Sequence, residues 1–436
     1  MGRAPRINKK GINTAINGHG LDDKCEVSKM TTNLGVKLKL YPNKKQIAYF
    51  EEAFNASRKV WNEVLGMQIE RYKNNKNLKF LGKYKTSLLV TAMKKEPQYV
   101  WMNQIDSTVL QCSCRKLDQA WQDFFKHKQK DTGKPHFKSH RNAKQSFTGV
   151  TVRNNCRIVA KRYAKLPKIG YVKTSRTDFL SKDAKICTYT VTRSPEGKYW
   201  LSLNLKTPDK KEKPKTSKAV GIDVGLKDLA ITSDGEKYPK FDGSVNEAKA
   251  KSWQSKFGRR YSKAKVLIAQ DEHNKALQPR SFDSFHGMNH AKNRKAHYQA
   301  KLAGERKSYM DYITTKLVNM YDLIAIEDLK VSNMQKNHNL AHNIANQSWY
   351  QFRHMLEYKC DWYGKKLVVV PPKDTSRTCS KCGKKNDDFS KLSTNEWLNV
   401  REWDCPYCGA HHDRDINAAK NILNKALKLK ENKKAS

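Results

Sequence analysis

Acidic residues are scarce in this sequence. Its 436 residues contain 42 aspartates and glutamates against 86 lysines and arginines, and the formal net charge is +44. A compact chain with such an excess of one sign repels itself unless a polyanion neutralises it, so we expect a nucleic-acid partner that contacts a large surface. The alternatives to a nucleic-acid partner are an effect of the charge on solubility and binding to an anionic membrane.

Long apolar runs are missing as well. Even the longest apolar runs are short, such as the four residues Leu367–Val370. A helix that spans a bilayer needs about 20 predominantly apolar residues. The basic N-terminus also lacks the apolar segment of a secretory signal. We therefore expect no membrane-spanning part and a cytoplasmic location.

A disulfide-type spacing of cysteines is absent too. Six of the ten cysteines are scattered, and four form the pairs Cys379-Ser-Lys-Cys382 and Cys405-Pro-Tyr-Cys408, each followed by a glycine. Four thiolates at this spacing predict a tetrahedral, structural Zn²⁺ site in a reducing compartment. Two redox-active pairs are the alternative, although no thioredoxin-like pattern surrounds them. We expect the adjacent His411 and His412 to be surface residues rather than ligands.

The patterns of the N-terminal half predict a helical unit and a β-module. We expect residues 1–33 to be a disordered basic arm, in which Met30 is as acceptable a start as Met1. Residues 43–128 carry apolar side chains at helical spacings, with Asn43 as the candidate cap. The barrel-like β-module takes residues 34–42 and 129–208. Its strands are predicted near residues 36–40, 146–160, 170–175, 185–192 and 199–205.

A Lys- and Pro-rich linker, residues 209–217, leads into mixed patterns that predict one layered α/β domain. The run Leu323–Ile326 is wholly apolar, which is typical of a strand buried on both faces. The other predicted elements are a hairpin of residues 219–223 and 228–232 closed by Ser233–Gly235, a long polar helical region over 245–319, a helix near 347–363, a strand at 367–370 and a last helix from Ile416.

Three carboxylates stand where a rigid core can present a charge. Asp223 and Glu327 follow apolar strands, and Asp415 opens the last helix. Taken singly, Asp223 could shape a turn and Asp415 could cap a helix. Taken together, such groups can hold two Mg²⁺ ions roughly 3.5–4 Å apart, of which one activates water and the other stabilises the leaving oxygen of a phosphodiester. The period-two alternation of a strand turns Asp328 away from the face of Glu327.

Several motifs occur together in the C-terminal half. They are Gly221-Ile-Asp-Val-Gly225, Ile326-Glu-Asp-Leu-Lys-Val331, Asn337-His-Asn-Leu-Ala341, Ser348-Trp-Tyr-Gln-Phe352, Leu356-Glu-Tyr-Lys359, Thr375-Ser-Arg-Thr-Cys-Ser-Lys-Cys-Gly383, Cys405-Pro-Tyr-Cys-Gly409 and Asp413-Arg-Asp-Ile-Asn-Ala-Ala419. Through them the chain resembles the TnpB family, the RNA-guided nucleases encoded by insertion sequences of transposable elements and related to compact type V CRISPR effectors. The resemblance is nearly continuous over residues 321–425, looser in the N-terminal half, and absent from residues 1–33 and 241–290.

This resemblance implies a multidomain α+β protein that binds a guide RNA and cleaves double-stranded target DNA beside a short flanking motif. A RuvC-like nuclease domain with an RNase H fold would take residues 218–374 and 413–436, the latter with a basic tail. A zinc ribbon, residues 375–412, would be inserted before the last carboxylate and would help to handle the target strand. The β-barrel module would be the wedge domain, and residues 43–128 the recognition lobe.

The same resemblance assigns roles to the acidic residues. Asp223, Glu327 and Asp415 match the positions of the family's catalytic carboxylates, which would bind Mg²⁺. Asp415 is preferred to Asp413 because the family's acid precedes x-Asn-Ala-Ala, as here. Every motif position needed for activity is present. Such a protein would act in the prokaryotic cytoplasm and lie on the nucleoid when bound to DNA.

Candidate nucleic-acid contacts lie in the N-terminal half. The loop that contains Phe137, Lys138 and Arg141 is basic and aromatic, and Arg58 and Asn62 lie one helical turn apart. A solvated charge run and core-capping roles account for these residues equally well.

Three other functions use the same features differently. An RNA-guided repressor would dock on DNA without cutting it. A guide-free transposase would use the same acids on the ends of the element. A zinc-ribbon RNA-binding protein would have no use for acids at strand ends.

Overall fold

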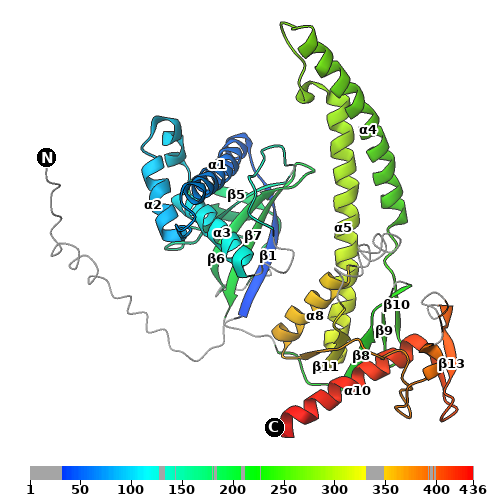
Figure 1. Cartoon of the computed structure of the whole chain (residues 1–436). Helices are drawn as coiled ribbons and strands as arrows, with labels where there is room; N and C mark the ends of the chain where they lie inside the picture. Colours follow the sequence, from blue (N-terminus) through cyan, green and yellow to red (C-terminus); the bar gives the residue numbers. More distant parts are fainter. Residues whose placement is uncertain are drawn as a thin grey trace, which may run out of the picture.

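The chain folds into an N-terminal and a C-terminal assembly, shown in a computed structural model (Figure 1). The structure describes residues 32–126, 133–142, 144–178, 180, 184–207, 212–225, 227–329, 348–390, 392, 396 and 399–435. Most of the predicted N-terminal arm, part of the linker and the Asn337–Ala341 motif lie outside these ranges. No helix within them is long and apolar enough to cross a membrane.

Seven antiparallel strands form the N-terminal sheet. They are β1 (Thr32–Tyr41), β2 (Gln145–Val150), β3 (Arg157–Ala160), β4 (Tyr163–Leu166), β5 (Gly170–Thr174), β6 (Lys185–Arg193) and β7 (Tyr199–Thr207). Their order is β2-β6-β7-β1-β5-β4-β3. Among the described residues no pairing joins the outer strands β2 and β3, so the predicted barrel is wrong and the sheet is open. The strand predicted over 146–160 is in fact two strands, with a turn at positive-φ Arg153 and Asn154.

Three helices pack with this sheet. They are α1 (Lys44–Asn74), α2 (Lys83–Met93) and α3 (Ser107–Lys126), with the 3₁₀-helix η1 (Pro97–Gln104) between the last two. Asn43 begins α1 with a capping box, because its side chain accepts from the backbone of Gln46 while the Gln46 side chain accepts from the backbone of Asn43. Phe54 of α1, Leu117 of α3 and Leu203 of β7 belong to one continuous core. The helical unit and the β-module are therefore packed as one body.

A five-stranded sheet forms the centre of the C-terminal assembly. Its strands are β8 (Ala219–Asp223), β9 (Asp228–Thr232), β10 (Lys237–Pro239), β11 (Leu323–Glu327) and β12 (Lys366–Val370), in the order β10-β9-β8-β11-β12. The predicted β8–β9 hairpin is confirmed, but Ser233–Gly235 turns the chain into β10 rather than closing that hairpin. Strands β8, β11 and β12 run parallel, so their carboxyl ends share one edge.

Helices cover both faces of this sheet. On one face, Ile324 and Ile326 of β11 join a core with α5 (His286–Met320) and α8 (Trp349–Tyr363). On the other face, Leu323 and Ala325 join a core with α10 (Arg414–Ala435). All five residues of β11 are buried, as the apolar run predicts. Because alternate residues of a strand face opposite sides, Asp223 and Glu327 both belong to the α10 face.

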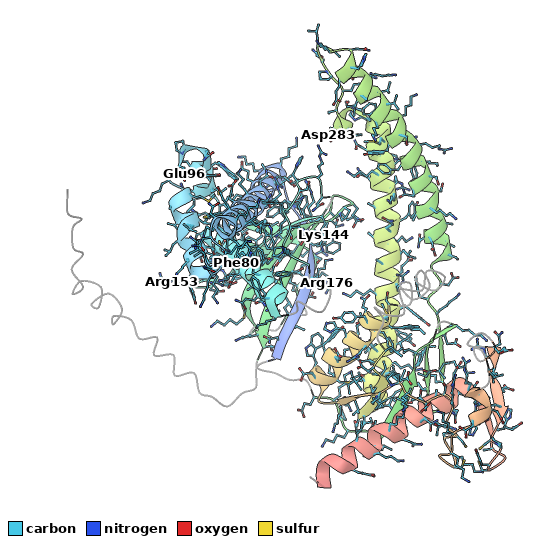
Figure 2. All side chains as sticks on the ribbon, in the orientation of Figure 1. Phe80, Glu96, Lys144, Arg153, Arg176 and Asp283 are labelled. Atoms are coloured by element: carbon cyan, nitrogen blue, oxygen red, sulfur yellow. The ribbon has the colours of Figure 1, made fainter. Side chains whose placement is uncertain are left out.

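The predicted helical region over 245–319 is a hairpin of two helices. Helix α4 (Ser244–His273) and α5 run side by side, and the short 3₁₀-helix η2 (Phe282–Ser284) lies in the turn between them (Figure 1). The hairpin extends away from the five-stranded sheet, beside the N-terminal assembly, and Asp283 lies near its far end (Figure 2).

A small module follows β12. It contains η3 (Asp387–Ser390) and the two-stranded sheet of β13 (Glu402–Asp404) and β14 (His411–Asp413). Phe389 and Trp403 pack edge to face in its core, together with Cys379 and Cys405. Strand β14 leads directly into α10, so the module is joined to the first turn of that helix.

Helix α10 lies so close to β8 that only glycine fits at position 221. A Cβ atom there would stand 2.0 Å from the backbone oxygen of Ala419 and 2.8 Å from the backbone nitrogen of Leu423. We expect Gly221→Ala to destabilise the protein by about 3 kcal/mol or more, since neither backbone atom can move alone. Thermal unfolding measures this change.

Gly258→Ala is the matched control. Gly258 lies inside α4, and no atom lies within 4 Å of the position that a Cβ atom would take there. Alanine loses less backbone entropy than glycine in a helix interior, so this variant should gain about 0.5–1 kcal/mol. Equal effects of the two substitutions would contradict the close approach of α10.

Candidate active site and cysteine centre

The ends of β8 and β11 bring two of the predicted carboxylates together. Ile326 pairs with Ile222 in parallel register, which places Glu327 beside Asp223 at the edge of the sheet. The hydroxyl of Thr375 donates a hydrogen bond to Oε1 of Glu327. Glu327 is 8% exposed, and Asp223 is partly exposed. The sheet therefore fixes both groups on rigid backbone at one place.

The third carboxylate comes from the first turn of α10. Asp415 lies close enough to Asp223 for their charges to interact. Its Oδ1 accepts from Nη2 of Arg414 at 2.9 Å, and its Oδ2 lies 3.6 Å from Nη1 of Arg401. These guanidinium groups hold the Asp415 side chain at the same edge as the strand ends.

Asp413 has a different role from Asp415. Its Oδ1 accepts from the backbone nitrogens of Asp415 and Ile416, both at 3.0 Å, so Asp413 caps α10. Its Oδ2 forms an ion pair with Lys237 at 2.6 Å. The helix-capping role that the sequence offers for Asp415 therefore belongs to Asp413.

Asp328 points away from the cluster, as strand alternation predicts. It is exposed, and its Oδ1 accepts from Nη1 of Arg353 on α8 at 2.6 Å. Helix α8 covers the face opposite α10. Asp328 therefore lies outside the cluster, although it is the residue next to Glu327 in the sequence.

The charges of the cluster oppose one another. Burial, then the negative charges of Glu327 and Asp415, raise the pKa of Asp223 well above its ordinary value, and Arg414 opposes that rise. Burial also raises the pKa of Glu327, against the hydrogen bond from Thr375 and the charge of Lys425. A cation placed among these oxygens would relieve their repulsion.

The carboxylate cluster is more widely spaced than a single-ion cage. In the described part of the chain, the four cysteines are the group whose metal-binding atoms all lie within 4.8 Å of one another. The three carboxylates together do not meet this limit. Hard oxygen donors of this kind fit Mg²⁺.

The four predicted cysteines converge at one point. The Sγ atoms of Cys379 and Cys408 lie 3.7 Å apart, and those of Cys382 and Cys405 lie 3.6 Å apart. A tetrahedron with Zn–S bonds of about 2.3 Å has edges of about 3.8 Å, so this spacing fits Zn²⁺. Gly383 and Gly409 have positive φ and complete the turn after each pair.

His412 differs from the sequence prediction, whereas His411 agrees with it. His411 is exposed and contacts Asp404. His412 is 8% exposed, and its Nε2 lies 3.0 Å from Sγ of Cys379. It is a buried neighbour of the cysteine centre, a position that the sequence does not reveal because both histidines lie on the same short polar stretch.

Two asparagines of α10 join the cysteine module to the carboxylate edge. Nδ2 of Asn417 donates to the backbone oxygen of Thr378 at 2.8 Å, and its Oδ1 accepts from the backbone of Ser380 at 2.8 Å. Nδ2 of Asn421 donates to the backbone oxygen of Thr375 at 2.8 Å. These hydrogen bonds fix the segment from Thr375, which binds Glu327, to the first cysteine pair on the helix that carries Asp415.

Sequence reasoning missed Thr375, Arg414 and Asn421 as parts of the site. Thr375 and Arg414 stand inside the motifs quoted for the family resemblance, and that membership is the signal that could have singled them out. Asn421 lies one helical turn beyond Asn417, a spacing that places both side chains on one face.

The predicted nucleic-acid residues lie around one loop. Asn62 holds this loop, because its Nδ2 donates to the backbone oxygen of Lys138 at 2.9 Å and its Oδ1 accepts from the backbone nitrogen of Lys138 at 2.8 Å. Nζ of Lys138 lies 3.4 Å from the centre of the Trp61 ring, and partial burial followed by repulsion from Lys116 lowers the pKa of Lys138 to about 8. Asn62 therefore positions the loop from α1.

The other three predicted contacts are accessible to different degrees. Arg58 is half-buried, and its Nη2 donates to Oδ1 of Asn55 at 2.7 Å. Phe137 is 60% exposed. Arg141 is exposed and lines a cleft towards the α4–α5 hairpin.

Three family models match separate parts of the chain. They are described as "Helix-turn-helix domain" over residues 30–77, "Probable transposase" over 202–338 and "Cas12f1-like, TNB domain" over 349–422, and the first two are models of the OrfB/IS605 family. Within the first match, residues 32–74 form β1 and the single long helix α1 rather than two helices joined by a turn. The third match contains the whole cysteine centre.

Two relatives match over most of the chain. A protein of Streptomyces pristinaespiralis named "Putative RNA-guided DNA endonuclease" is 32% identical over 395 residues, which are 89% of this chain and 88% of that protein. A protein of Escherichia coli K12 named "Putative RNA-guided DNA endonuclease InsQ" is 27% identical over 407 residues, 89% and 90% of the two chains. "TnpB-like protein L79" of Acanthamoeba polyphaga mimivirus is 33% identical over 138 residues, 30% and 25% of the two chains. With these motifs, this site and these relatives, the chain belongs to the OrfB/IS605 family of TnpB proteins.

Proposed function

We propose that this protein is an RNA-guided DNA endonuclease. It binds a guide RNA and hydrolyses phosphodiesters of double-stranded target DNA beside a short flanking motif. The observation that carries the proposal is the meeting of Asp223, Glu327 and Asp415 at one sheet edge of a chain with a net charge of +44. The cationic surface attracts the polyanions, and the acidic cluster supplies ligands for the metal ions that hydrolysis needs. Such a protein works where prokaryotic DNA lies, in the cytoplasm and on the nucleoid.

The proposed domains follow the two assemblies. Residues 218–374 and 413–436 form a RuvC-like domain of the RNase H type, supported by a sheet of three antiparallel and two further parallel strands with helices on both faces. Residues 375–412 form a zinc-ribbon insertion that handles the target strand. The open sheet, residues 34–42 and 129–208, is the wedge domain, and residues 43–128 are the recognition lobe.

The cluster's residues have distinct roles in the proposed hydrolysis. Two Mg²⁺ ions, when bound, would supply an activated water and stabilise the leaving oxygen. Asp223, Glu327 and Asp415 hold those ions. Thr375 fixes Oε1 of Glu327, which leaves the other oxygen to face the cluster. Arg414 orients Asp415 and offsets part of the negative charge around Asp223.

The cysteine centre is proposed to be structural. Four thiolates close the coordination of Zn²⁺ and leave no position for a substrate. Because Asn417 and Asn421 bind the backbone beside this centre, the metal also stabilises the segment that carries Thr375. An RNA-guided repressor and a guide-free transposase remain the rival functions, and the intact carboxylate cluster argues against the repressor.

Substitution of the cluster tests the nuclease directly. We expect Asp223→Ala, Glu327→Ala and Asp415→Ala each to reduce guide-directed cleavage in Mg²⁺ by at least about 10³-fold, since each removes a ligand of the catalytic ions. Binding of guide and target should persist. The measurement is single-turnover cleavage of a labelled duplex with the RNA that co-purifies with the protein.

Asp328→Ala is the matched control for this experiment. It removes a carboxylate adjacent to Glu327 that pairs with Arg353 outside the cluster, so cleavage should stay within about threefold of wild type. Unchanged cleavage by a cluster variant would remove that residue from the site. Absence of cleavage by the wild type despite guide and target binding would favour the repressor, and guide-free binding of element ends would favour the transposase.

The repulsion within the cluster predicts a stability change in the metal-free protein. Because the pKa of Asp223 is raised in the folded state, its carboxylate destabilises the fold as the pH rises above the ordinary value of 3.8. Asp223→Asn should therefore raise the melting temperature at pH 7 by about 2–4 °C in EDTA, and the gain should shrink as the pH falls. A lower melting temperature for Asp223→Asn at pH 7 would contradict this repulsion.

Zinc content tests the cysteine centre. We expect atomic emission to find one Zn²⁺ per wild-type chain and about none in the Cys382→Ser/Cys408→Ser variant. Loss of the metal should also make residues 375–412 much more sensitive to protease. Cys187→Ser, which changes a half-buried cysteine of β6 outside the group, should keep its zinc. Full zinc in the double variant would show that these thiolates are not the ligands.

A further inference from the structure

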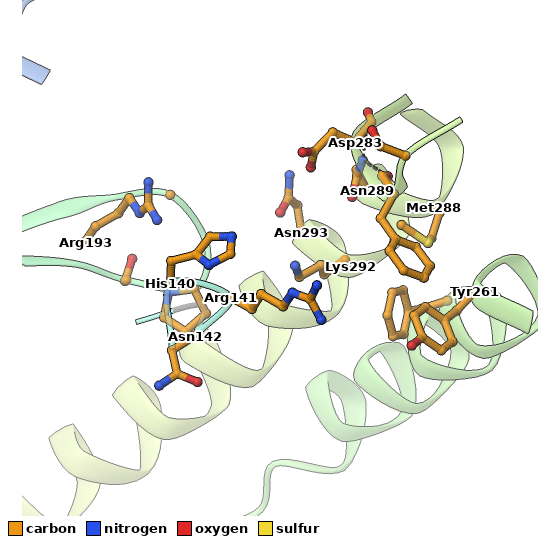
Figure 3. Close-up of a pocket in the computed structure, with 16 residues that line it drawn as sticks. His140, Arg141, Asn142, Arg193, Tyr261, Asp283, Met288, Asn289, Lys292 and Asn293 are labelled. Carbon is orange, nitrogen blue, oxygen red and sulfur yellow. Dashed lines mark hydrogen bonds between the residues drawn. The ribbon is translucent and has the colours of Figure 1, made fainter. Parts of the chain in front are cut away.

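A cleft of about 690 Å³ lies between the N-terminal assembly and the α4–α5 hairpin (Figure 3). One wall consists of the loop at residues 140–142 and the turn between β6 and β7 at residues 193–197. The other wall comes from the middle of α4, from η2 and from the first turns of α5. None of these residues has a part in the proposed chemistry.

The hairpin wall of the cleft is aromatic. The rings of Tyr261 and Phe282 are stacked, with centroids 5.3 Å apart and an interplanar angle of 9°, and Phe257 lies 5.7 Å from Tyr261. Tyr261 is 42% exposed and Phe282 is 38% exposed. Rings that stay this exposed at the side of a cleft offer a flat surface on which a planar ligand can stack.

The cations of the cleft come from both walls. Arg141 extends from the loop towards the helices, and Lys292 stands on α5 (Figure 3). Both side chains are exposed. Arg193 is engaged elsewhere, since its Nη1 donates to Oε2 of Glu51 at 2.7 Å. Arg141 and Lys292 are therefore the cations placed to meet an anionic group that enters the cleft.

Asp283 and two asparagines of α5 also line the cleft. Asp283 lies on η2, and Asn289 fixes that turn by donating from Nδ2 to the backbone oxygens of Phe282 at 3.0 Å and Asp283 at 3.3 Å. Asn293 faces the cleft one helical turn further along α5 (Figure 3). A carboxylate beside two cations repels a phosphate but accepts a hydrogen bond from a sugar hydroxyl.

We propose that this cleft binds one unpaired RNA nucleotide. Its base stacks on the Tyr261–Phe282 wall, its phosphate meets Arg141 and Lys292, and its 2′-hydroxyl donates to Asp283, a contact that deoxyribose lacks. None of the three carboxylates lines the cleft. The bound nucleotide joins the N-terminal assembly to the nuclease half. This inference rests on the proposed function, because the nucleotide belongs to the guide RNA.

Binding titrations test the stacking wall. The probe is a labelled synthetic copy of the RNA that co-purifies with the full chain, alongside a DNA copy of the same sequence. We expect Tyr261→Ala to weaken RNA binding about tenfold, within the range of about 5- to 150-fold that loss of one stacked base gives. Tyr261→Trp keeps a stacking surface and should bind like wild type. Tyr312→Ala, which removes a 64%-exposed tyrosine elsewhere on α5, should have no effect.

The charged residues give separate readouts. Arg141→Gln should reduce the slope of log affinity against log salt by about one, because it removes one phosphate contact. Asp283→Asn should narrow the preference for RNA over DNA by about threefold or more while the salt slope stays the same or rises. Equal affinities of Tyr261→Ala and Tyr261→Trp would overturn the proposal. An unchanged preference for RNA over DNA in Asp283→Asn would overturn its assignment to RNA.

The experiments distinguish a wrong assignment of the cleft from a wrong assignment of the nuclease function. Cleavage by wild type with unchanged binding by the Tyr261 variants would leave the nuclease standing and remove the cleft. If no defined RNA co-purifies, the guide-directed function fails. The same titrations with a 20-nucleotide oligoadenylate and its deoxy counterpart then test the cleft alone, with the same expected and contradicting results.

Discussion

The mutual repulsion of three carboxylates at one sheet edge is the constraint on which the C-terminal assembly depends. Burial and the charges of Glu327 and Asp415 both disfavour an ionised Asp223, so the fold must hold these groups together by other means. Those means are the parallel pairing of β8 with β11 and the close packing of α10 on Gly221. A site assembled against its own electrostatics is one that cations complete.

The cysteine module extends that constraint beyond the sheet. Its first cysteine pair follows directly on the segment whose Thr375 hydroxyl binds Glu327, and the asparagines of α10 hold both. Strand β14 ends at Asp413, which caps the helix that carries Asp415. A metal bound by the four thiolates would therefore stabilise the approach to the carboxylates from two sides.

The sequence predicted most of the C-terminal elements because their signals are local. The apolar run at 323–326, the paired cysteines and the acids at strand ends each depend on a few neighbouring residues. Features that depend on distant contacts were missed or wrong. The closure of the β-module depends on whether β2 meets β3, and the burial of His412 depends on Cys379, 33 residues away. No short-range pattern reports either contact.

The candidate site shows the same division. Strand periodicity separated Glu327 from Asp328, and the structure agrees, with Asp328 turned to Arg353. Periodicity could not separate Asp413 from Asp415, since both stand at the start of one helix, and the preference for Asp415 came from the family resemblance. The hydrogen bonds by which Asp413 caps the helix supply a physical reason for preferring Asp415.

Anomalous diffraction from crystals of the full chain with guide RNA, uncleaved target and Mn²⁺ tests the central claim most directly. The account predicts two manganese peaks about 3.5–4 Å apart, bound by oxygens of Asp223, Glu327 and Asp415 and next to one phosphate of the target. A target phosphate at that edge with no manganese on these carboxylates, in crystals whose dissolved complex cleaves DNA, would contradict it.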